Sequence, residues 1–232
     1  MKIDVQHRPA YALAVVHLEP EETVVAESGA MVSMDSHVAM ETSAANKEGA
    51  GLMKGLMSGL KRMVAGESFF QNKYSSPGAP GHVTFAPTMV GDIDVYDLDG
   101  STGIMLQSNA YLCSAETVDV DAKWGGAKNF FGGENMIMLK VTGTGPVAFN
   151  SFGGIKVIDV KDEYIVDTGH IVAFEDTLSF TVTRFGGGWK AFIFGGEGLV
   201  CRFKGTGKLY IQTRNPQGFG EAIGPKLPMR EG

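Results

Sequence analysis

Cysteine, basic residues and long apolar runs are scarce in this sequence, and each shortage excludes a class of protein. Two cysteines, Cys113 and Cys201, are too few for a disulfide framework, and both lie in apolar runs that favour buried free thiols. No stretch reaches the roughly 18 apolar residues that a transmembrane helix needs. Residues 1–18 lack the pattern of a signal peptide, so we expect a cytoplasmic protein.

Positive charge is also in short supply. The chain has 20 Lys and Arg against 26 Asp and Glu, a formal net charge of −6. This balance argues against a DNA partner, and it does not favour an RNA partner, which needs basic and aromatic side chains along one exposed edge. The one notable basic cluster is near the C-terminus and is typical of a solvated face; it comprises Arg202, Lys204, Lys208 and Arg214.

Glycine, by contrast, is abundant. The chain has 32 glycines in 232 residues, roughly twice ordinary usage, with no G-X-Y period that would indicate collagen. Hydrophobic residues make up 44% of the chain, which is typical of a globular protein. Together these numbers favour many tight turns between short strands.

The sequence repeats itself. An apolar run followed by Gly-Glu recurs at residues 63–67, 129–134 and 191–197, and each copy precedes an alternating strand that begins near residues 80, 143 and 205. A polar turn leading into a strand recurs as well, as ESGAMV (27–32), QSNAYL (107–112) and DTGHIV (167–172). A third landmark, IDVYD (93–97), returns as IKVID (155–159). These landmarks predict three copies of one all-β unit of about 60 residues.

We therefore expect an all-β fold in a single compact body spanning residues 1–232. The three repeats are predicted at residues 1–98, 99–160 and 161–232. A unit of this size has too little core to stand alone. The repeats are thus expected to close around a pseudo-threefold axis or to stack edge to edge, which would hide exposed strand edges.

One segment breaks the β pattern and predicts a helical insertion in the first repeat, over residues 52–64. Its apolar and small residues follow helical spacing, and Lys54, Lys61 and Arg62 lie away from the apolar stripe. The helix is a candidate contact with the protein's own body or a sister subunit, and a membrane surface is the less favoured alternative. The candidate contact residues are Gly51, Leu52, Gly55, Leu56, Gly59 and Leu60.

The run GLKRMVAGESFF (59–70), with the later FFGGE (130–134) and FGGE (194–197), resembles the mitochondrial-biogenesis family named for altered inheritance of mitochondria. The resemblance covers about residues 12–216. It implies a fold like the tryptophan RNA-binding attenuation protein (TRAP), a short double-stranded β-helix, here repeated three times. It implies no activity, catalytic residue or ligand. The mitochondrial role of fungal members does not transfer, because we see no Arg-rich, acid-poor leader.

Little in the sequence indicates catalysis. The histidines form no H-x-H or H-E-x-x-H pair, so the metal site of a cupin is not expected, nor is any cofactor. Glu67, Glu134 and Glu197 follow the repeated Gly-rich runs. Each is expected to accept backbone N–H bonds at its turn, and the alternative is a carboxylate cluster on a threefold axis.

Three functional hypotheses follow. The leading one is a non-enzymatic binding or scaffold protein that assembles as a homo-oligomer through exposed β edges. The second is a peripheral membrane organiser that uses the Met-rich helix. The third is a cupin-like small-molecule enzyme with a metal site not visible in the sequence.

Overall fold

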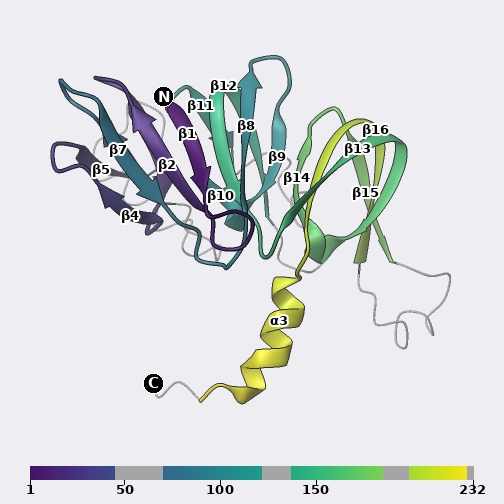
Figure 1. Cartoon of the computed structure of the whole chain (residues 1–232). Helices are drawn as coiled ribbons and strands as arrows, with labels where there is room; N and C mark the ends of the chain where they lie inside the picture. Colours follow the sequence, from purple (N-terminus) through teal and green to yellow (C-terminus); the bar gives the residue numbers. More distant parts are fainter. Residues whose placement is uncertain (45–69, 122–136, 185–198, 229–232) are drawn as a thin grey trace.

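The computed structural model describes residues 1–44, 70–121, 137–184 and 199–228. Strands dominate it (Figure 1), and the α-helix found within those ranges is α3 (Pro216–Ile223), which projects from the sheets. The prediction of an all-β fold is therefore confirmed. The predicted helical insertion at residues 52–64 lies outside the described residues.

The strands fall into three groups according to their hydrogen-bond partners. The chain begins with β1 (Lys2–Gln6), which precedes the first group. The first group contains β2 (Leu13–Leu18), β3 (Thr23–Glu27), β4 (Met31–Met34), β5 (Ala39–Ala44), β6 (Phe70–Ser75) and β7 (Gly81–Phe85). The second group contains β8 (Ile93–Asp99), β9 (Ile104–Gln107), β10 (Tyr111–Ala115), β11 (Val118–Asp121) and β12 (Met138–Asn150). The third group contains β13 (Ile155–Asp167), β14 (Ile171–Glu175), β15 (Ser179–Arg184) and β16 (Leu199–Gln212).

The pairing inside each group follows one scheme. In the third group β13, β14 and β15 all pair antiparallel with the long strand β16. In the second group β8, β9, β10 and β11 pair with β12 in the same way. In the first group the long strand is split into β6 and β7, which pair with β2, β3, β4 and β5. The predicted repeat boundary after residue 160 falls inside β13, which is continuous.

A β-bulge recurs at the same position in all three groups and supports a common pairing scheme. The register shifts between Met31 and Ser33 in β4, between Tyr111 and Cys113 in β10, and between Ile171 and Ala173 in β14. In the second and third groups the preceding turn is a 3₁₀ helix at residues 108–110 and 168–170, where the sequence predicts polar turns. We therefore treat β4, β10 and β14 as equivalent strands, and their residues as equivalent position by position.

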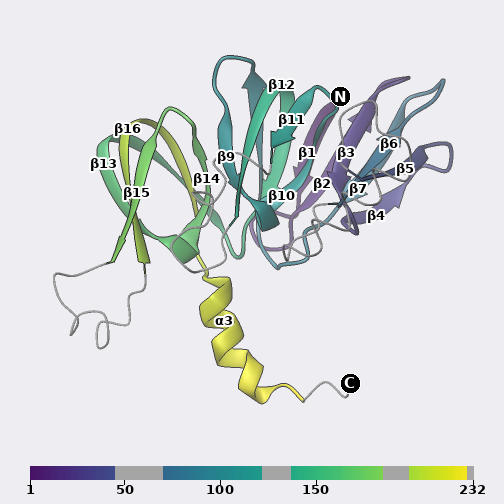
Figure 2. The same cartoon turned by 180° about the vertical axis from the view of Figure 1, so that it is seen from behind.

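Neighbouring groups join edge to edge in an open row (Figures 1 and 2). β10 pairs with β3 of the first group, and β14 pairs with β9 of the second group. The register is equivalent at both junctions, because Cys113 faces Ala26 and Ala173 faces Leu106. Among the described residues the terminal strands are β1 and β4 in one sheet and β13 and β5 in the other, and β4 and β13 lie at opposite ends of the row (Figures 1 and 2).

Each of the three hydrophobic cores contains residues from a neighbouring group. Leu112 of β10 is fully buried in the core of the first group, and Val172 of β14 is fully buried in the core of the second. The core of the third group includes Met105 and Met138 of the second. Burial of these apolar side chains stabilises the junctions together with the cores themselves.

Candidate functional site

The most distinctive surface of the molecule is the free edge of β4. Val32 is 56% exposed and Met34 is 38% exposed, although their equivalents Leu112, Ser114, Val172 and Phe174 are buried. β10 and β14 have a strand on both sides, whereas β4 pairs only with β7 in the described part of the chain. An apolar strand is thus left open at one end of the row.

A second free edge lies on β13, which pairs only with β16 within the described ranges and stands at the opposite end of the row (Figure 1). Its Tyr164 and Ile165 are 39% and 41% exposed. Through their pairing with Phe203 and Arg202 they are equivalent to Ile104 and Met105, which are buried where β14 pairs with β9. The free edge of β13 therefore presents the surface that the second group uses to receive the third.

The closed junctions show what such an edge contacts when it is covered. At the first junction the buried Tyr111 hydroxyl lies 3.1 Å from the Val25 carbonyl oxygen, to which it donates, and 2.9 Å from Ser114 Oγ. Burial raises the pKa of Tyr111, so the hydroxyl stays protonated and can donate. At the second junction the Tyr96 hydroxyl donates to Glu175 Oε1 at 3.0 Å. Burial raises the pKa of Tyr96 to about 12.

An ion pair also spans each junction. Lys73 Nζ lies 2.5 Å from Glu116 Oε1 at the first, and Lys140 Nζ lies 3.6 Å from Asp176 Oδ2 at the second. The basic residue is on the receiving group and the acidic residue follows the incoming strand. Because these pairs are partly exposed, they orient the strands more than they stabilise them.

Glu27 lies at the end of β3, beside the first junction. Desolvation by burial raises the pKa of this carboxyl to about 7. A carboxyl with such a pKa changes charge near neutral pH. Its position gives the junction a group whose charge responds to pH.

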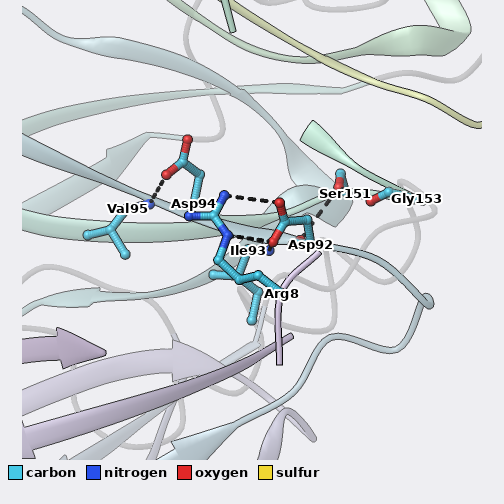
Figure 3. Close-up of polar contacts among 7 residues, drawn as sticks. All are labelled: Arg8, Asp92, Ile93, Asp94, Val95, Ser151 and Gly153. Carbon is cyan, nitrogen blue, oxygen red and sulfur yellow. Dashed lines mark hydrogen bonds and ion pairs between the residues drawn. The ribbon is translucent and has the colours of Figure 1, made fainter. Parts of the chain in front are cut away.

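A buried carboxylate anchors the loop before β2 to the start of β8 (Figure 3). Arg8 Nε and Nη2 donate to the two carboxylate oxygens of Asp92 at 2.8 and 3.0 Å, and Asp92 is nearly fully buried. The Ser151 amide donates to the Asp92 carbonyl oxygen at 3.0 Å. A Cβ on the neighbouring Gly91 would lie 1.9 Å from the Ser151 carbonyl oxygen, so only glycine fits there. Since both carboxylate oxygens are engaged by Arg8, we interpret this cluster as a structural anchor.

Histidines and aspartates form a row across the outer face of the first group. His17 Nε2 lies 2.9 Å from Asp4 Oδ2, and His82 Nδ1 lies 3.0 Å from Asp35 Oδ2. The two rings meet edge to face with their centroids 4.7 Å apart. The His82 contacts hold the pKa of Asp35 below its ordinary value. Within the described ranges no three such side chains converge as metal ligands would.

The residues singled out from the sequence lie outside the described residues. These are Gly51, Leu52, Gly55, Leu56, Gly59 and Leu60 of the predicted helix, and the carboxylates Glu67, Glu134 and Glu197. The basic cluster is described in full. Arg202 and Lys204 form ion pairs with Glu163, Lys208 pairs with Asp159, and Arg214 donates to the Thr213 carbonyl oxygen.

Sequence reasoning did not single out Val32, Tyr164 or Ile165. The signal was present, because the repeated polar turns align Met31-Val32 with Tyr111-Leu112 and Ile171-Val172. The alignment does not say which copy stands at the end of the row. Among the helices that the structure describes, none has the length and apolar character to cross a bilayer.

Fold and edges together define a class: an all-β protein whose strand groups complete one another at two junctions and leave β4 and β13, the strands equivalent to those at the junctions, unpaired on one side in the described residues. The chain belongs to the family described as mitochondrial biogenesis AIM24, whose model matches residues 3–214. The family resemblance seen in the sequence is therefore confirmed, whereas the TRAP-like fold stays a prediction.

Two bacterial proteins are similar over almost the whole chain. An uncharacterized protein of Streptococcus pyogenes serotype M6 is 29% identical over 231 residues, which cover 98% of this chain and 92% of the relative. A crystal structure of a Streptococcus pyogenes protein, from a structural genomics consortium, has a TM-score of 0.76 at 25% identity. That alignment covers 97% of this chain and 99% of the other.

Proposed function

We propose that the protein is a non-enzymatic scaffold that assembles with copies of itself through the free edges of its sheets. The observation that carries this proposal is the exposure of Val32 on β4, when the equivalent Leu112 and Val172 are fully buried. In this proposal the three strand groups are three repeats of one TRAP-like double-stranded β-helix unit. Each repeat needs a neighbour, and the two end repeats find theirs in other copies.

The chemistry of β4 supports this proposal. An open strand offers unpaired N–H and C=O groups, and proteins that must stay monomeric protect such edges with charged residues or proline. β4 reads MVSM and has neither. An unprotected apolar edge of this kind is typical of a surface that another strand covers.

The other hypotheses gain less from the structure. The membrane hypothesis depends on residues 52–64, which lie outside the described residues. The cupin hypothesis needs converging metal ligands, and the described His17 and His82 contact Asp4 and Asp35 pairwise on a surface.

Sedimentation velocity of the full chain tests the proposal. The wild type is expected at a multiple of the 24.7 kDa chain mass, because the free edges are then covered. Val32→Asp places a charge in the covered strand and is expected to shift the population to the monomer. Val90→Asp is the matched control, since Val90 is 55% exposed in the loop before β8 and should leave the mass unchanged.

A wild-type chain that sediments as a monomer at micromolar concentrations would contradict the proposal. So would an oligomer that Val32→Asp and Val90→Asp leave equally intact, provided that circular dichroism shows both variants folded.

A further inference from the structure

The two junctions inside the chain define a template for a third. At each, a bulged strand enters from the following group and pairs with the outer side of a strand in the preceding group. The residue at the bulge, Leu112 or Val172, enters the preceding core and becomes fully buried. The next three positions pair in the same register at both junctions.

The two ends of the row carry the two halves of such a junction: an incoming bulged strand, β4, and a receiving strand, β13. β4 already has the bulge, between Met31 and Ser33, and presents Val32 at the place of Leu112 and Val172. β13 pairs with β16 on one side, and its Tyr164 and Ile165 stand exposed at the places of Ile104 and Met105. One chain cannot join its own halves, because β4 and β13 lie at opposite ends in both views (Figures 1 and 2).

We propose that β4 of one copy adds to the free edge of β13 of a second copy, head to tail, with Val32 buried in the core of the second copy's third group. This inference rests on the proposed self-assembly and names its geometry. By the register of the internal junctions, Ser33 faces Val166, Met34 faces Ile165 and Asp35 faces Tyr164. Because the two surfaces differ, a pair of copies still has one free half at each end, so the assembly grows into a filament or closes into a ring.

Charged residues also stand close to the two free halves. At each internal junction the receiving group supplies a lysine, Lys73 or Lys140, and the incoming strand is followed by an acid. In the third group the basic residue at that place is Arg202, which faces Ile165 in β13 as Lys140 faces Met105 in β9. By the same alignment the position after β4 that matches Glu116 and Asp176 is Ser36, and the acid nearest to it, Asp35, stands one position earlier.

Disulfide trapping with two single-cysteine variants tests the register. Met34→Cys and Ile165→Cys chains, mixed and oxidised, are expected to form a mixed disulfide, because directly opposed strand residues meet its geometry. The native thiols do not interfere, since burial raises the pKa of Cys113 and Cys201 to about 12. The control is Val157→Cys in place of Ile165→Cys: Val157 is 43% exposed on the same strand, eight positions away, and should give no disulfide.

The outcomes separate this inference from the proposed function. Suppose that the wild type is an oligomer. If Val157→Cys then crosslinks as well as Ile165→Cys, or if either variant alone crosslinks as well as the mixture, the head-to-tail geometry is wrong. The proposal of self-assembly would still stand. If the wild type is a monomer, both fail. A second measurement uses charge: Met34→Lys and Ile165→Glu chains should each lose the large assembly, and mixing them should restore it, because the two introduced charges then face each other. A mixture that forms dimers but no larger assembly would overturn the register, and one that stays monomeric would overturn the head-to-tail geometry.

Discussion

Tyr111 shows how single residues hold the groups together. Its ring is buried in the core of the second group, and its hydroxyl reaches the Val25 carbonyl oxygen of the first. The same hydroxyl is within 2.9 Å of Ser114 Oγ. A buried polar group of this kind stabilises the fold only while its partners stay in place.

Tyr111→Phe is expected to lower the free energy of unfolding by about 1–2 kcal/mol, because it leaves the partly buried Val25 carbonyl oxygen without that donor. Urea denaturation followed by circular dichroism measures the change. Tyr11→Phe is the matched control, since Tyr11 is largely exposed and should change stability little. Equal effects of the two substitutions would contradict the role given to the hydroxyl.

Glu27 makes stability depend on pH with a definite sign. Its folded pKa, about 7, lies above its ordinary value of 4.5, so the folded state holds the proton more tightly than the unfolded state. Stability is therefore greatest below the unfolded pKa and falls as pH rises through the folded pKa. Because part of the side chain remains in water, we expect a loss of about 1–2 kcal/mol between about pH 5 and pH 8.

Glu27→Gln should remove that component of the pH dependence. Denaturation midpoints of wild type and variant at the two pH values measure it as a difference of differences, in which other titrating groups cancel. Glu41→Gln, at an exposed glutamate, is the control. If the wild type and Glu27→Gln lose the same stability between pH 5 and pH 8, the desolvation of Glu27 has no net effect on stability.

At the scale of elements, β4, β10 and β14 are one kind of strand in different surroundings. Leu112→Ala is expected to destabilise the isolated chain by about 2–5 kcal/mol, because it leaves a cavity in the first core. Val32→Ala removes a smaller and exposed side chain, and it should change stability only at concentrations where copies associate. Thermal denaturation across a range of protein concentrations compares the two; a large, concentration-independent loss with Val32→Ala would contradict the equivalence.

Local sequence patterns predicted these strands better than they predicted their neighbours. Alternation indicated β10 and β14, and the polar turns predicted before them are the 3₁₀ turns of the structure. The offset of 62 between Ile93 and Ile155 matches the starts of β8 and β13. The exposure of Val32 could not be predicted, since it depends on which group ends the row. The anchor of Arg8 on Asp92 could not be predicted either, because it joins residues 84 apart through packing alone.

At the scale of the molecule, the cores are shared and so should unfold together. The first core contains Ile93, Leu112 and Ala148 of the second group, and the third core contains Met105 and Met138. We expect a single calorimetric transition at low concentration, with equal calorimetric and van't Hoff enthalpies. Two resolved transitions would show that the groups are independent despite their shared side chains.

The junction scheme also bears on how such a chain changes length. The second group receives β14 on one side and sends β10 into the first group on the other, so it carries both halves of the junction. Removing it, or duplicating it, would leave β4 at one end and β13 at the other. Tandem duplication or loss of a middle group therefore alters the length of the protein without redesigning its ends, and in the proposed head-to-tail assembly chains of different group number would copolymerise.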